Sequence, residues 1–340
     1  MRNNDSQSFY IILRCYIQVT DLLMTCSKVL IIGLGQLGLA AAKYVKERGF
    51  DTYGYDIDTE AMKIAHRSAG IKQVRDFSSH DFDVYVICVS THKSDDIFSP
   101  QIDGILSIAD KISREAKKDG ALVSVESTIP KGTTKKVFEI LHHRLHVVHV
   151  PHRWYALEEK EHGVNQLRVI GGVYDCCLRA GMQFYNGINS VEEKKDRHPD
   201  IIHTSHNNLG ITLYSVSNIE IAETTKIVEN CHRYLQIAFA EELYLYCQAN
   251  NINFLELRDA LNTKWNVKIL EPREGIGGHC LPKDTKIFLQ SSKSISSKIL
   301  AAAMKVDEDY KRYRANLYSQ PETKISVNTT QKMSLRFGST

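Results

Sequence analysis

Hydrophobic and polar positions divide the chain into two parts that differ in period. From residue 28 to about residue 188, short apolar runs rich in β-branched residues alternate with helical stretches. From about residue 215 onward, the apolar positions recur at helical spacing. Short apolar runs between helices are typical of strands buried on both faces of a parallel sheet. The pattern predicts an α/β fold: a Rossmann-type doubly wound parallel sheet, followed by an all-helical domain built on one long helix.

The first predicted strand leads into a dinucleotide-binding motif. The predicted strands are residues 28–32, 51–56, 82–90, 121–125, 147–150 and 169–172. After the first strand come the glycine-rich segment 33–38, a helix to residue 48, and a strand that ends in an acid. This order admits a pyrophosphate at the helix N-terminus and a ribose hydroxyl at the acid. The candidate cofactor-binding residues are Gly33, Gly35, Gln36, Leu37, Gly38 and Asp56.

The residue after Asp56 bears on the choice of cofactor. No arginine directly follows Asp56 to accept a 2′-phosphate, so NAD is favoured over NADP. The alternative is a tight strand–helix turn that binds no ligand. Three polar loops follow later strands, at residues 90–96, 126–134 and 151–163. Ligands of doubly wound sheets bind beyond the carboxyl ends of the strands, so these loops are expected to face one crevice.

The second part is predicted to begin with one long helix. Residues 215–250 would exceed about 45 Å at about 1.5 Å per residue. A helix of this length is expected to pack against a second subunit, so we predict a homodimer. Lys226 and Asn230 are four residues apart and share a face of it, although Lys226 could instead pair with Glu223 or Glu229. Shorter helices are predicted at residues 254–262, 285–289 and 299–311.

A single cysteine lies in the glycine-rich stretch from Gly275 to Asp284. Cys280 lies two residues before Pro282, and proline is common at the first position of a helix. At a helix N-terminus, the positive end of the dipole is expected to lower the pKa of the thiol and favour a nucleophilic thiolate. Asp284 lies one helical turn further on. The alternative is a glycine loop around a buried, inert cysteine.

Composition narrows the classes of function. The 340 residues carry a net charge of +3, and no basic stripe interleaves with aromatic residues, so no nucleic-acid partner is expected. The eight cysteines show no paired metal-ligand spacing, so no metal site is expected. We interpret them as free cysteines without disulfides, which indicates a reducing, cytoplasmic location. Residues 9–24 are too short and too charged for a membrane span and lack the features of a signal peptide.

These patterns set the expected domain boundaries. Residues 24–190 are predicted to form an NAD-binding Rossmann domain, and residues 191–315 a helical domain that dimerises and carries catalytic residues. Met24 stands just before the first strand, so residues 1–23 are expected to be a disordered or non-native extension. Residues 316–340 are polar and aperiodic and are predicted to be disordered.

Taken together, the motifs resemble the nucleotide-sugar 6-dehydrogenases: the UDP-glucose, GDP-mannose and UDP-N-acetylmannosamine dehydrogenases. The matching segments, in order, are residues 33–38 with Asp56, then 86–91, 126–133, 222–230 and 275–284. The resemblance covers about residues 28 to 289. It implies the NAD-dependent oxidation of the C6 alcohol of a nucleotide-diphosphate sugar to the uronic acid, in the synthesis of polysaccharide precursors. It also implies that Ser90, Thr91 and Thr128 contact the cofactor.

The resemblance further implies a covalent mechanism. The Cys280 thiolate would add to the aldehyde as a thiohemiacetal, a second oxidation would give a thioester, and water would release the carboxylate. Lys226 and Asn230 would donate to the oxyanion at C6. Asp284 would position a water or hold Lys226, and Thr128 would lie near the reacting centre.

Three departures from the family pattern bear on activity. His152 stands in the place of a glutamate that assists thioester hydrolysis, so His152 and Glu161 are the candidate bases. His92 follows Thr91 where the family usually has proline. The chain ends before the family's C-terminal nucleotide-sugar-binding domain, so one alternative is a catalytically weak or silent NAD-binding dimeric module. Another is a two-domain hydroxyacid dehydrogenase without a cysteine nucleophile.

Overall fold

The computed structural model divides into two compact units. It describes residues 28–92, 96, 100–154, 163–187, 208–278, 280–291 and 297–319. The first unit comprises residues 1–232 and 279–296, and the second comprises residues 233–278 and 297–340. Glu161, one of the two candidate bases, lies outside the described residues.

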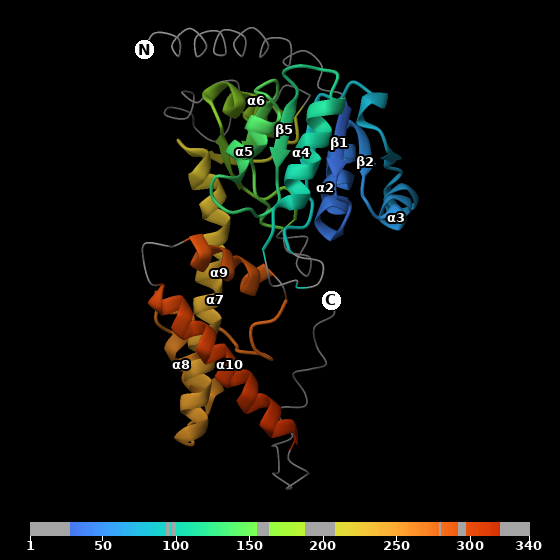
Figure 1. Cartoon of the computed structure of the whole chain (residues 1–340). Coiled ribbons are helices and arrows are strands. Elements are labelled where there is room, and N and C mark those ends of the chain that lie inside the picture. The colour runs from blue at the N-terminus through green and yellow to red at the C-terminus, as the bar shows by residue number, and fades with distance from the viewer. Residues whose placement is uncertain are drawn as a thin grey trace, which may run out of the picture. The chain divides into compact units, whose positions relative to one another are not determined.

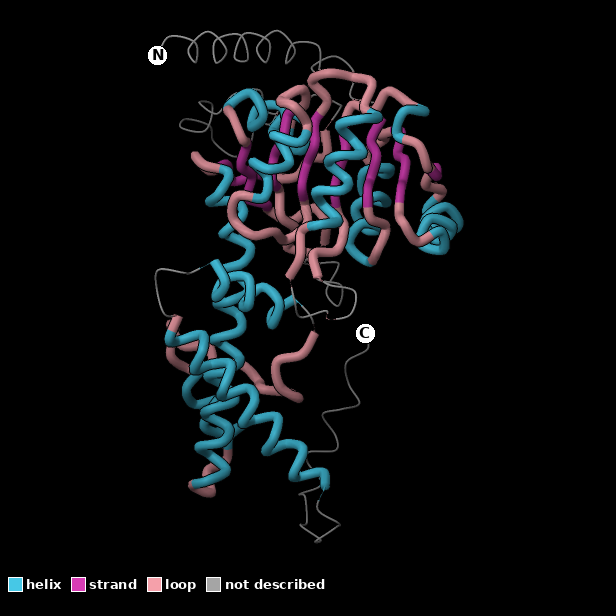
Figure 2. The backbone as a smooth tube through the Cα atoms, viewed as in Figure 1, coloured by secondary structure: helices cyan, strands magenta, loops and turns pink. Residues whose placement is uncertain are grey.

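The first unit is built on one eight-stranded sheet with the order β3-β2-β1-β4-β5-β6-β7-β8 (Figures 1 and 2). The strands are β1 (Lys28–Ile32), β2 (Asp51–Tyr55), β3 (Lys72–Gln73), β4 (Val84–Ile87), β5 (Leu122–Val125), β6 (His146–His149), β7 (Arg168–Gly172) and β8 (Leu213–Ser215). Among these strands, only the pair β6–β7 is antiparallel. The strand order reverses between β1 and β4, which is where a doubly wound sheet opens a ligand crevice.

Helices connect these strands and continue after them. They are α2 (Gln36–Glu47), α3 (Thr59–Ala69), α4 (Asp103–Glu115), α5 (Thr133–Ile140), α6 (Asp175–Asn186), α7 (Ile219–Ala249), α8 (Phe254–Asn262), α9 (Cys280–Ser291) and α10 (Lys298–Ser319), with a short 3₁₀ turn at Phe77–Ser79. Figure 1 shows α4 lying in front of the strands of the sheet. None of the described helices is long and apolar enough to cross a membrane.

The core of the sheet follows from the apolar runs in the sequence. Val29 to Ile32 are fully buried, as are all four residues of β4 and of β5. Because helices cover these strands, a continuous apolar run is stable where an alternating one would leave polar groups unsolvated. The predicted α/β class, with a doubly wound sheet followed by helices, is confirmed.

The structure differs from the predicted elements in several places. The sheet continues past residue 190, because β8 pairs in parallel with β7. Helices α3, α5 and α6 have no counterpart among the predictions, since each is short and only half apolar. The predicted strand 82–90 is shorter as β4, and α7 begins four residues later than predicted. Helix α10 runs to Ser319, beyond the expected boundary at residue 315.

The second unit holds the start of the cysteine loop against α10. Asp307 accepts a hydrogen bond from the backbone N–H of Ile276 at 2.9 Å, and Lys311 Nζ donates to the Ile276 carbonyl at 2.9 Å. Gly275 has a φ of +94°, and an added Cβ would lie 2.9 Å from the Lys311 side chain. Glycine is therefore required where the chain turns into this loop.

Candidate active site

The glycine-rich segment between β1 and α2 has the local geometry of a pyrophosphate cradle. Gly33 has a φ of +91°, and an added Cβ would lie 2.8 Å from the backbone of Cys88. An added Cβ on Gly38 would lie 1.8 Å from the Gly33 carbonyl oxygen, whereas one on Gly35 would meet nothing within 4 Å. The first and third glycines thus allow close packing, and the second faces open space at the start of α2, where a phosphate group fits.

Asp56 supports this cradle from the end of β2. Its carboxylate accepts from the backbone N–H of Leu34 at 2.6 Å and from that of Asp58 at 2.9 Å. The aspartate therefore lies beside the glycine-rich segment, where a ribose would follow the pyrophosphate. Gln36 and Leu37 form the first turn of α2.

A buried lysine links the crevice to α9. Lys283 Nζ donates to Thr91 Oγ1 at 2.8 Å and lies 3.2 Å from Asp284 Oδ1. Thr91 follows β4, so this contact joins the end of the central strand to the first turn of α9. Ser90, the other predicted cofactor contact in this loop, is exposed, and its hydroxyl lies 2.7 Å from His92 Nδ1. We did not assign Lys283 a role from the sequence.

Helices α7 and α9 bring three of the predicted catalytic residues together. Asn230 Nδ2 donates to Asp284 Oδ2, and the Cys231 thiol lies 4.0 Å from the Asp284 carbonyl oxygen. Asp284 is almost fully buried, at 1% exposure. Cys280 is the first residue of α9, one turn before Asp284. The predicted role of Asp284 in holding Lys226 is not what these contacts show, because Asn230 and Lys283 are its partners.

The alternative partners of Lys226 are engaged elsewhere. Glu223 accepts from the backbone N–H groups of Gly132 at 2.6 Å and Thr134 at 2.8 Å, and it is fully buried. Glu229 pairs with Arg153. The positive charge of the half-buried Lys226 instead opposes the rise in the pKa of the Cys280 thiol. This arrangement favours the interpretation of Lys226 as a site residue over that of a surface ion pair.

The thiol of Cys280 differs in one respect from the sequence prediction. The residue is exposed as a whole, yet burial around its sulfur raises the thiol pKa, and Asp284 raises it further. The positive charges of Lys283 and Lys226 act in the opposite direction. The predicted position at a helix N-terminus is therefore right, but the expected lowering of the pKa is wrong because desolvation and a nearby carboxylate outweigh it.

His152 is buried beside a carboxylate that the sequence did not single out. Its Nε2 lies against the carboxylate of Glu126, at the end of β5. Glu126 also contacts Arg168 Nη1 at 3.2 Å and accepts from the Tyr185 hydroxyl. Thr128, two residues further on, is half-buried in the same loop. The four buried groups come from separate strands and a helix, so only the fold brings them together: they are Glu126, His152, Arg168 and Tyr185.

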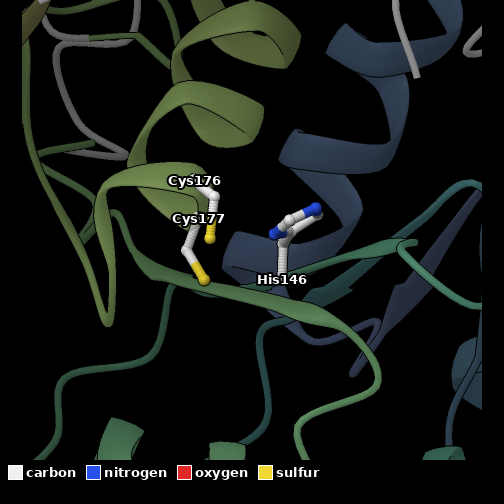
Figure 3. A group of neighbouring side chains, drawn as sticks. All are labelled: His146, Cys176 and Cys177. Carbon is white, nitrogen blue, oxygen red and sulfur yellow. The ribbon is translucent and has the colours of Figure 1, made fainter. Parts of the chain in front are cut away.

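Two groups of side chains in the described part of the chain have the residue types of a metal site. In one, Cys88, Glu126 and His152 lie within 4.8 Å of one another, but Glu126 is already paired with Arg168. The other comprises His146, Cys176 and Cys177, whose sulfurs lie beside the imidazole in Figure 3. His146 begins β6, at the end of the strand opposite the crevice, so we assign these three residues to the packing of α6 on β6.

Comparison with known proteins matches both parts of the chain. Residues 60–189 match the NAD-binding domain of the UDP-glucose/GDP-mannose dehydrogenase family, and residues 220–309 match the central domain of the same family. A UDP-N-acetyl-D-mannosamine dehydrogenase from Pyrococcus horikoshii is 28% identical over 332 residues, which span 89% of this chain and 73% of the relative. The corresponding enzyme from Escherichia coli is 26% identical, over 84% of this chain and 70% of its own.

Solved structures extend the comparison to the fold. The structure of the P. horikoshii enzyme superposes with a TM-score of 0.70 at 26% identity, covering 86% of this chain and 70% of that one. A 3-hydroxyisobutyrate dehydrogenase from Mycobacterium tuberculosis shares the fold, with a TM-score of 0.62 at 12% identity, covering 86% and 94%. Both family domains are matched in order over more than half of the sequence, so the chain belongs to the UDP-glucose/GDP-mannose dehydrogenase family.

Proposed function

We propose that this chain oxidises the C6 alcohol of a nucleotide-diphosphate sugar to the uronic acid, with UDP-N-acetylmannosamine as the first substrate to test. The observation that carries the proposal is that Cys280 begins α9 and that Asn230 on α7 donates to Asp284, one turn after Cys280; the charge of Lys226 acts on the same thiol. The names of the P. horikoshii and E. coli relatives favour a UDP-linked amino sugar. Such a product would serve polysaccharide precursor synthesis.

Each of these four residues has a role that its chemistry supports. NAD supplies the hydride acceptor for both oxidations. The Cys280 sulfur adds to the C6 aldehyde, and the resulting thiohemiacetal is oxidised to a thioester. Lys226 and Asn230 extend from one face of α7, so their N–H groups can donate to the oxyanion that forms at C6. Asp284 keeps the Asn230 amide in place through its buried carboxylate.

Lys283 and Thr91 couple these residues to the cofactor side. The Lys283 ammonium is buried at 5% exposure and has two oxygen partners, one on Thr91 after β4 and one on Asp284 of α9. A buried charge that bridges two elements fixes their relative position, because losing either partner leaves the charge uncompensated. The contact therefore supports a role in keeping the start of α9, and with it Cys280, next to the loop after β4.

The test is NADH formation with purified protein and a panel of UDP- and GDP-sugars. About two NADH per sugar consumed is expected, because an alcohol-to-acid oxidation transfers two hydrides. Cys280→Ser should abolish formation of the acid while NAD binding, followed by calorimetry, is retained. A hydroxyacid dehydrogenase would instead keep full activity in Cys280→Ser. NAD binding without any NADH from the whole panel would favour the silent NAD-binding module.

A homodimer through α7 is part of the proposal. Four large apolar side chains on this helix are 43% exposed or more: Ile221, Val228, Phe239 and Tyr246. Their spacings of seven, eleven and seven residues place them on one helical face. Exposed apolar stripes of this kind are typical of interfaces. Phe239→Glu with Tyr246→Glu should convert the dimer to a monomer in light scattering, and a wild-type monomer at micromolar concentration would refute the dimer.

A further inference from the structure

A carboxylate at the end of β5 lies at the centre of a buried polar network. Glu126 is 4% exposed. Its oxygens contact His152 Nε2, Arg168 Nη1 and the Tyr185 hydroxyl, and the Cys88 thiol lies 3.9 Å away. The Ser124 hydroxyl extends the network to Tyr185 at 2.7 Å.

The network fixes the charge of Glu126. Burial alone would raise the pKa of this carboxyl, but the positive charges of His152 and Arg168 and the hydrogen bonds lower it to about 2. Glu126 is therefore ionised at neutral pH and can only accept hydrogen bonds. The hydrogen between the two residues must then belong to Nε2 of His152.

The same environment fixes the protonation of His152. Burial first and Arg168 next lower the pKa of the imidazole, whereas Glu126 acts in the opposite direction. A neutral imidazole that carries its hydrogen on Nε2 has a lone pair on Nδ1. This Nδ1 is buried and has no hydrogen-bond partner among the described residues. Buried nitrogens of this kind normally have a partner, so a water or a ligand group is expected there.

His152 is linked with hydrolysis by its place in the sequence, because it stands where the family has the glutamate that assists this step. The positive charge of Lys226 contributes to the lowered pKa of His152, and the same charge acts on the Cys280 thiol. His152 and Cys280 thus share the positive charge of Lys226 as an electrostatic neighbour.

We propose that Glu126 is a positioning residue for thioester hydrolysis: it holds His152 in the Nε2–H tautomer, so that Nδ1 takes the proton of the attacking water. This inference rests on the proposed function. The water oxygen forms a bond to the acyl carbon and passes one proton to Nδ1. The C–S bond then breaks, its electron pair stays on the Cys280 sulfur, and the carboxylic acid leaves and gives its own proton to solvent after release. Glu126 stabilises the imidazolium until it returns the proton to the sulfur.

The experiment separates hydrolysis from oxidation. Wild type, Glu126→Gln and His152→Gln are mixed with NAD and the active nucleotide sugar, and NADH is followed from the first turnover. Both variants should give a burst of about two NADH per site and then slow by about 10²-fold or more, as expected for loss of a general base. Mass spectrometry should show the acyl group on Cys280 in the variants and little in wild type. His149→Gln removes a buried histidine of β6 that hydrogen-bonds to the Val125 carbonyl instead, and it should hydrolyse the thioester normally.

Three results would overturn the inference. Steady turnover at the wild-type rate in Glu126→Gln would show that the carboxylate is not needed. Loss of the first NADH together with hydrolysis, in variants that still bind NAD, would place the network in oxidation or in structure. A long-range ¹H–¹⁵N spectrum of the wild type that shows the His152 hydrogen on Nδ1 would exclude the required tautomer. If wild type forms no NADH at all, the proposed function fails, and this spectrum alone tests the pairing of Glu126 with His152.

Discussion

A buried glutamate in the second unit makes stability depend on pH. Glu241, on α7, is fully buried, and Asp307 of α10 and the backbone of Ile276 are its polar neighbours. Burial first and Asp307 next raise the pKa of Glu241 from 4.5 to about 8, although Lys311 acts against them. In the unfolded chain the carboxyl ionises near its ordinary pKa, whereas the folded chain keeps it protonated to about pH 8. Stability is therefore lost as the pH rises from about 4.5 to about 8.

Glu241→Gln should remove this loss of stability. The size of the gain follows from the difference between the pKa values of Glu241 in the unfolded and folded chain. One pH unit corresponds to about 1.4 kcal/mol, so the interval from 4.5 to about 8 corresponds to at most about 5 kcal/mol. Side-chain relaxation and water entry reduce such a cost, so we expect about 2 kcal/mol of stabilisation at pH 8. At pH 5, about half a pH unit above the ordinary value of 4.5, the folded chain keeps the glutamate protonated and little of this loss has accumulated, so the gain should be much smaller.

Calorimetry at pH 5 and pH 8, at one protein concentration and ionic strength, measures the effect. Each kcal/mol should raise the Tm by roughly 2–4 °C. The matched control is Glu242→Gln, which changes the adjacent but exposed residue and should leave the Tm nearly unchanged at both pH values. An equal shift of the Glu241→Gln Tm at pH 5 and pH 8 would refute the reasoning, because a packing effect does not depend on the charge of this carboxyl.

Three further predictions concern the glycine-rich segment, Lys283 and His152. Gly38→Ala should destabilise the fold by about 3 kcal/mol or more, since its Cβ would lie 1.8 Å from a carbonyl oxygen, whereas Gly35→Ala should keep the Tm and weaken NAD binding in calorimetry. Lys283→Met should destabilise by about 3 kcal/mol in thermal unfolding, because it leaves the buried Asp284 carboxylate without its cation. Hydrolysis of a preformed acyl-enzyme should stay level from pH 8 to 6.5 and fall only below that, because burial lowers the pKa of His152 and the neutral form is the base.

The elements that the sequence predicted well are those with a local signal. The first strand, the glycine-rich segment and the strand ending at Asp56 were found because sterics at the glycines and the position of the acid are decided within about thirty residues. Helix α8 begins and ends at the predicted residues, since the Asn253 side chain caps its first turn. Strand β8 escaped prediction because three residues carry no period, and only pairing with β7 stabilises it.

The residues of the candidate site also differ in whether a local sequence signal indicates them. Asn230 and Asp284 could be named from helical spacing and motif, and the structure places them in contact although 54 residues separate them. The Lys283–Thr91 contact joins residues 192 apart, and neither has a local pattern that indicates the other. Such pairs depend on where β4 and α9 meet in the fold.

The pKa values show why residue type alone does not determine chemistry. A cysteine at a helix N-terminus is ordinarily a candidate for a lowered pKa, but at Cys280 desolvation and Asp284 prevail. His152 alone would be an ordinary histidine that titrates near neutral pH. Placed between Glu126 and Arg168 in the core, it has a carboxylate at Nε2, and burial lowers the pKa of its imidazole. A side chain becomes a base of defined geometry only when a second residue, distant in sequence, fixes where its proton lies.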